Sequence, residues 1–138
     1  MKALLRRIGD ARSGRRGNES GSAVVDFALV GALLTVVFIA IIQLALVLHV
    51  RNSLIDAASS GARYGTLADR TPGDAAARTS SLISGSLNSG FAQDITVGTT
   101  NVDGIELLRV TVRAPLPVIG LIGPGGAMEV SGHAVLPQ

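Results

Sequence analysis

Cysteine is absent from the 138 residues, and aromatic side chains make up only 3% of them. Without cysteine there is no disulfide framework, no thiolate nucleophile and no cysteine-ligated metal site. The chain has no tryptophan and a single tyrosine, so basic side chains cannot alternate with aromatic ones as they do on nucleic-acid surfaces. A fold of this size without disulfides must depend on packing, on an anchor or on neighbouring subunits.

Charged side chains are also scarce, and they are unevenly distributed. Residues 1–21 carry six basic and two acidic side chains, whereas residues 22–138 carry six arginines and eight acids. The basic excess therefore belongs to the amino-terminal segment, which indicates neither a basic functional face nor a nucleic-acid partner. This segment is rich in arginine, glycine and serine, and we expect residues 1–21 to be a leader peptide without packed structure.

An apolar run follows the leader. Residues 27–50 contain no Asp, Glu, Lys or Arg in 24 positions. As a helix the run spans roughly 36 Å, enough to cross a hydrocarbon core of about 30 Å. The basic residues before it predict a cytoplasmic amino terminus and an extracytoplasmic carboxyl-terminal part, in a single-pass protein of the plasma (inner) membrane. A cleaved secretory signal is a poor rival, because its apolar region is only about 7–15 residues long.

We expect this helix to continue beyond the membrane, over residues 22–65. Small residues recur every four positions at Ala57, Gly61 and Gly65, a spacing that lets another backbone come close. Alternatively, Gly61 or Gly65 only caps the helix end. We favour a cap at Gly65 and close packing at Ala57 and Gly61.

Residues 66–138 predict a second helix and then a small sheet. Asp74 can cap a helix over about residues 75–89, with Gly90 at its end. The hydrophobic period then changes to two, and Asp103-Gly104 suits a hairpin turn. The fold class expected is α+β, with three antiparallel strands near residues 95–99, 108–114 and 128–135.

The connection over residues 115–122 is unusually apolar for a loop. In the interpretation we favour, Val118, Ile119 and Ile122 fold back over the sheet edge and complete the core. The alternative is a docking patch for a partner or for the membrane surface.

The segment from Gly21 to Phe27 resembles the processing site of type IV prepilin-like proteins. In those proteins a prepilin peptidase cuts after a glycine and leaves an acidic residue at the fifth mature position, just before the membrane helix. Here the resemblance places the cut between Gly21 and Ser22, which makes Asp26 the fifth mature residue.

The residues around the apolar run are similar to those of the TadE-like family, the minor pseudopilins of the Tad (Flp) pilus. The similarity lies in the acid-Phe-Ala-Leu start at residues 26–29, in Arg51-Asn52, and in residues 56–58 and 61–64. Family members usually carry Glu where this chain has Asp26. The resemblance implies a type IV pilin-like fold. It also implies four partners: the prepilin peptidase, other pilus subunits, the inner-membrane assembly platform and membrane lipid.

Elementary electrostatics supports a role for Asp26. Cleavage would create an α-amine with an ordinary pKa of about 7.7–8.0, largely protonated at neutral pH. A carboxylate in the first helical turn is stabilised by roughly 0.3–1 kcal/mol. In an assembly, the amine of one subunit can pair with the Asp26 of the next, which favours one register. Alternatively, Asp26 is a solvated acid of the headgroup region without a partner.

The remaining polar residues of note favour structural roles. Gln43 can hydrogen-bond either to a neighbouring helix or to a backbone carbonyl of its own chain. His49 and His133 are isolated, which makes a metal site improbable. No serine has a His–Asp constellation and no glycine-rich phosphate loop follows a strand. We therefore expect no catalytic residue, no cofactor and no small-molecule substrate.

Two functions from different classes follow. The preferred one is a processed minor pseudopilin of the Tad pilus, acting in pilus assembly, adhesion or protein secretion and incorporated into a surface pilus. The alternative is an uncleaved, single-pass anchored binding or scaffold protein of a secretion system. An exported enzyme is a third idea that no residue constellation supports.

Overall fold

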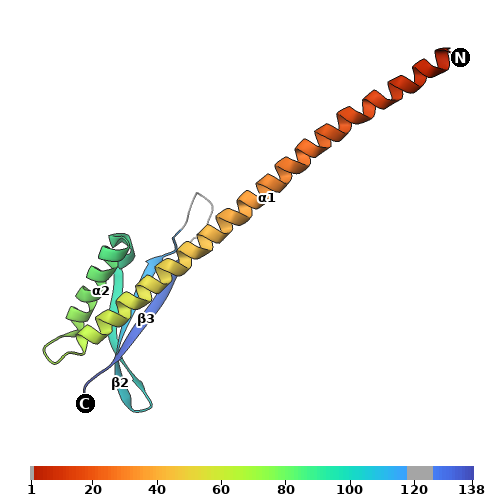
Figure 1. The fold of residues 1–138 in the computed structure, drawn as a ribbon. Helices are drawn as coiled ribbons and strands as arrows, with labels where there is room; N and C mark the ends of the chain where they lie inside the picture. Colours follow the sequence, from red (N-terminus) through yellow and green to blue (C-terminus); the bar gives the residue numbers. More distant parts are fainter. Residues whose placement is uncertain (1, 118–125) are drawn as a thin grey trace. The chain divides into compact units, whose positions relative to one another are not determined.

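The computed structural model describes residues 2–117 and 126–138, with side chains from Gly17 onward. The elements in chain order are α1 (Lys2–Gly65), α2 (Pro72–Ser86), the 3-10 helix η1 (Ser89–Ala92), β1 (Asp94–Val102), β2 (Ile105–Pro115) and β3 (Ala127–Val135) (Figure 1). They belong to two compact units, one ending at Ile42 and the other beginning at Gln43. The α+β class, with a long apolar helix, a second helix and three antiparallel strands, is confirmed.

The first unit consists of α1 as far as Ile42. The leader is helical from Lys2 onward, and a Cβ added at Gly17 or Gly21 would meet no atom within 4 Å. The apolar side chains that follow are exposed, with Phe27 at 81%. The hydroxyl of Thr35 donates to the carbonyl oxygen of Gly31 at 2.8 Å. This bond gives the Thr35 hydroxyl a partner within its own helix, as a polar group in a lipid environment requires because no water is there to bind it.

The second unit is built on an antiparallel sheet in the order β1-β2-β3. The predicted hairpin turn joins β1 to β2, with φ of 52° at Asp103 and 83° at Gly104. Two consecutive positive φ angles are what the favoured two-residue hairpin turn requires. The side-chain oxygen of Asn101 accepts a hydrogen bond from the Gly104 amide at 3.0 Å and braces the turn.

The core of this unit lies between one face of the sheet and the helices. Alternate residues of β2, including Val110 and Val112, are fully buried, and so are Leu54 and Ala58 of α1 and Ile83 of α2. Each large side chain of this kind contributes about 1.5–3 kcal/mol by leaving water. The carboxyl-terminal part of α1 is therefore a structural member of the second unit.

Glycines set how closely the elements approach. A Cβ at Gly132 of β3 would lie 2.3 Å from the backbone nitrogen of Ser59, so α1 rests directly on the strand. A Cβ at Gly61 would lie 1.8 Å from the Thr79 hydroxyl oxygen, and one at Gly65 would lie 2.6 Å from the Ala75 Cβ. Side chains at these positions would push α1 away from β3 and α2.

The ends of α2 differ from those expected. Thr71, not Asp74, is the N-cap residue, and the helix begins at Pro72 because proline needs no N–H partner in the first turn. Asp74 is the third helical residue and completes a capping box, in which its carboxylate accepts from the Thr71 amide at 2.8 Å. The helix ends at Ser86, before Gly90, because Leu87 leaves the helical conformation and Asn88 caps η1.

The apolar connection after β2 is described only in part. Leu116 packs against the core, and its amide donates to the Gly126 carbonyl oxygen at 3.1 Å. Both interpretations of Val118, Ile119 and Ile122 fall on residues 118–125, which lie outside the described residues.

The contact at Gly132 gives a stability prediction. We expect Gly132→Ala to lower the free energy of unfolding by about 1–3 kcal/mol, because its methyl group overlaps the α1 backbone. Gly98→Ala is the matched control in the same sheet, since a Cβ there meets nothing within 4 Å. Thermal unfolding of the full chain in detergent micelles measures both. Equal stabilities of the two variants would contradict the close approach of α1 to β3.

The capping box gives a pH prediction. The backbone hydrogen bond from Thr71, helped by its side chain, holds the pKa of Asp74 below its ordinary value. A depressed folded-state pKa stabilises the fold above the unfolded-state pKa of about 3.9, and this stabilisation is lost as the pH falls through the folded-state value. The gap in melting temperature between the natural chain and Asp74→Asn should therefore be constant near neutral pH and shrink below about pH 4. A gap that widened on acidification would contradict this.

Candidate functional site

The residues of the predicted processing site lie on one exposed stretch of α1 in the first unit. Gly21 and Ser22 are exposed, and Gly21 has open space around its α-carbon. Ser22 and Asp26 are four positions apart, so they share one face of the helix. A protease that approaches this segment meets no packed structure of the described chain around Gly21.

Asp26 is exposed at the start of the apolar run. No salt bridge to its carboxylate is found among the described residues. Its neighbours Val24, Val25 and Phe27 are 67%, 55% and 81% exposed. An acid surrounded by exposed apolar side chains is poorly placed in lipid unless another molecule supplies a positive charge.

The apolar surface that follows belongs to a helix able to cross a membrane. Residues Gly17–Gly65 form the single such helix found in the described part of the chain, and its apolar window is entirely exposed. One long apolar helix of this kind fits a membrane anchor. The apolar groups could instead be covered by other helices of the same type.

Gln43 uses its amide within its own chain. Its Nε2 donates to the backbone carbonyl oxygen of Pro117, within the second unit. Of the two interpretations left open by the sequence, the structure therefore shows the bond to a backbone carbonyl. His49 and His133 are both exposed, and no group of three His, Asp or Glu side chains that could hold a metal occurs among the described residues.

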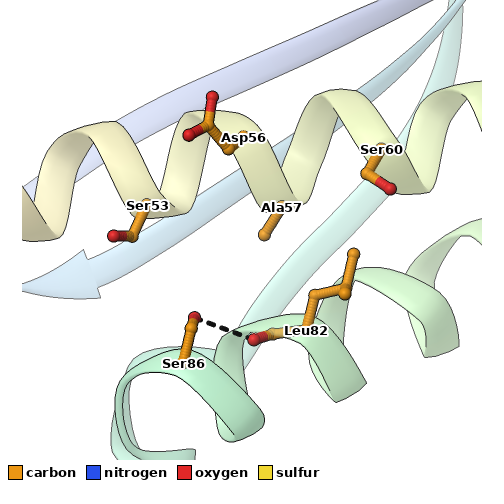
Figure 2. A pocket seen from close by; sticks show the side chains of 6 residues that line it. All are labelled: Ser53, Asp56, Ala57, Ser60, Leu82 and Ser86. Atoms are coloured by element: carbon orange, nitrogen blue, oxygen red, sulfur yellow. Dashed lines mark hydrogen bonds between the residues drawn. The ribbon is translucent and has the colours of Figure 1, made fainter.

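A shallow groove separates α1 from α2 in the second unit. Its volume is about 320 Å³. Figure 2 shows its lining, which comes from Ser53, Asp56, Ala57 and Ser60 of α1 and from Leu82 and Ser86 of α2. The Ser86 hydroxyl donates to the Leu82 carbonyl oxygen at 2.8 Å. The groove exists because the residues of α1 that line it are small or short.

Two features were not predicted from the sequence: the close approach at Gly132, and the lack of a salt bridge at Asp56 and Arg109 among the described residues. Gly132 lies in a strand of alternating pattern, and only the position of α1 reveals why it has no side chain. Asp56 and Arg109 are ordinary surface charges until the helix and the sheet are placed. Their signal would have been the lack of an opposite charge three or four residues away on a helix, or directly opposite on a strand.

One comparison with known proteins gives a match, and the matched residues all lie in α1. A family model described as TadE-like protein matches residues 21–63. No curated protein and no solved structure matches the chain. The matched segment begins at Gly21, includes Asp26 and the apolar run, and ends two residues before α1 does. The chain thus carries a segment similar to the TadE-like family, and this match supports an association with the Tad pilus.

Proposed function

We propose that the protein is a minor pseudopilin of the Tad (Flp) pilus, processed by a prepilin peptidase between Gly21 and Ser22. The observation that carries the proposal is the family match that begins at Gly21 and continues through the apolar helix. The TadE-like family is structural rather than enzymatic. The protein acts in pilus assembly, and through the pilus in adhesion or secretion.

The geometry of the leader supports cleavage. Gly17 and Gly21 each lower helix stability by about 1 kcal/mol relative to alanine. Local unwinding at Gly21 is therefore cheap, and an extended backbone without a side chain can enter a protease site. The basic leader remains in the cytoplasm, the helix from about residue 27 to 50 spans the inner membrane, and the part of the chain after residue 50 lies outside the membrane.

The assembly role follows from Asp26. Cleavage places a new ammonium group on Ser22, on the same helix face as Asp26. Within one helix the two charges attract each other, and in a bundle the amine of one subunit reaches the Asp26 of the next. The partners are other pilus subunits and the inner-membrane assembly platform, which receives the processed helix from the lipid.

Processing is tested at Gly21. In cells that contain the Tad machinery, we expect membrane-extracted protein to begin at Ser22, and Gly21→Val to remain full length. Gly17→Val is the matched control, because Gly17 is equally exposed and open but is not at the cut. Intact-mass analysis and amino-terminal sequencing measure the start. A natural chain that still carries residues 1–21 would favour an uncleaved anchored scaffold protein.

The pairing of Asp26 is tested by Asp26→Val. This variant should insert into the membrane and be cleaved, yet its amount in purified pili should fall about tenfold or more, since loss of one buried charge partner costs several kcal/mol. Asp26→Glu is the control and should assemble, because it keeps the carboxylate. Normal incorporation of Asp26→Val would contradict the pairing whatever the outcome at Gly21.

A further inference from the structure

The outer face of the sheet, away from the helices, carries two arginines of β2, Arg113 and Arg109, which have different neighbours. Across its first row, Asp94 and Glu129 flank Arg113. The Arg113 Nε donates to the Glu129 Oε2 at 2.6 Å, and this bond raises the pKa of Arg113. The positive charge of Arg113 is therefore already paired with an acidic side chain of the same sheet.

Arg109 lies four residues before Arg113 on β2, and no acidic side chain lies opposite it. It lies between Gly98 of β1 and His133 of β3, and the adjacent row consists of the hydroxyl residues Thr96, Thr111 and Ser131. Arg109 is exposed and forms no salt bridge among the described residues. Gly98 leaves open space beside it, although glycine weakens a strand. A glycine inside a strand often marks a site where a ligand or another backbone approaches closely.

Apolar side chains border Arg109 on its other side. Leu107 and Val135 form the next row, followed by Val102 and Ile105. Val102, Ile105 and Val135 are 50%, 44% and 60% exposed. An arginine beside exposed apolar side chains is the composition typical of the centre of a protein interface. We call Arg109, His133 and these apolar residues the sheet patch.

The groove of Figure 2 has the complementary chemistry on the other side of the unit. Asp56 is two residues from the buried Leu54, so at 100° per residue it lies on the opposite face of α1 from Leu54. Its carboxylate forms no salt bridge among the described residues. Asp56 is exposed at the rim of the groove, and Figure 2 shows its carboxylate turned away from α2. The rim of the groove thus carries one exposed negative charge, and the groove itself is lined by serine hydroxyls and by Leu82.

We propose that the sheet patch of one copy of this chain docks onto the α1–α2 groove of a second copy, with Arg109 facing Asp56. The two surfaces carry opposite unpaired charges and lie on opposite sides of the same unit, so each copy can bind one neighbour on each side. This inference deepens the proposed assembly role by naming a contact between subunits.

The symmetry of the proposed contact is compatible with subunits that are all anchored in one membrane. A contact between two different surfaces is heterologous, and repetition of such a contact builds open rows or helical filaments. Copies related in this way by a simple shift keep their α1 helices pointing in one direction, as anchoring in one membrane requires. A two-fold contact with its axis perpendicular to the helices would instead turn one anchor away from the membrane.

The absence of cysteine makes the contact directly testable. Two full-length chains with different tags are produced in the same cells, one with Ser53→Cys in the groove and the other with Ser131→Cys beside the sheet patch. Both substitutions leave Asp56 and Arg109 intact. Oxidation of the membranes should give a disulfide-linked dimer that carries both tags. Ala127→Cys is the matched control for Ser131→Cys, since it lies on the same strand and face, four residues away, and it should give severalfold less.

Charge reversal tests the named pair in the same assay. Arg109→Glu or Asp56→Arg alone should lower the cross-linked fraction about two- to fivefold, as expected for an exposed ion pair. The double variant should restore it, and Arg113→Gln should have little effect. Equal cross-linking from Ala127→Cys, capture only of a different protein, no mixed dimer, or no restoration would each overturn the proposal. Amino-terminal analysis of the same membranes reports cleavage at Gly21 separately, so failure of the contact and failure of processing are distinguishable.

Discussion

Direct contact between the α1 backbone and its neighbours is the constraint on which the second unit depends. At Gly132 the strand β3 meets the backbone of Ala58 and Ser59, and at Gly61 the helix α2 meets α1. These approaches bury Leu54 and Ala58 completely. Three strands with one covered apolar face are about the minimum for independent stability. The helix that leaves the apolar run therefore supplies the cover that the sheet needs, and no disulfide is required.

Most helices, strands and turns of this fold can be predicted from the sequence, because each depends on residues that are close together in the chain. The uncharged residues 27–50 predict the long helix, the two-residue period predicts the strands, and Asp103-Gly104 predicts the hairpin. The start of α2 is harder to predict, because Thr71 and Asp74 can both cap a helix and only the position of Pro72 in the first turn decides between them. The role of Gly132 could not be predicted at all, since it depends on a distant segment of α1.

Some residues of the candidate sites can be predicted from their neighbours in sequence, and others only from the folded structure. Gly21 and Asp26 stand out because their chemistry depends on neighbours in sequence, namely a basic leader before them and an apolar helix after them. Asp56 and Arg109 do not stand out, since the sign of a surface charge becomes informative only when the partners of the other charges are known. Arg113 illustrates this point, because it has Glu129 and Asp94 opposite it on the neighbouring strands, whereas Arg109 has no acid opposite it.

The order of the chain has a consequence for its biogenesis. β3 is synthesised after α1, α2, β1 and β2, yet it lies directly against α1, which is made long before it. A contact between segments so distant in sequence forms late in folding. A polypeptide that terminates before β3 would leave part of the apolar surface of α1 and β2 open to water, where proteases and chaperones recognise unfinished chains. Only molecules that contain β3 would then survive to be used in assembly.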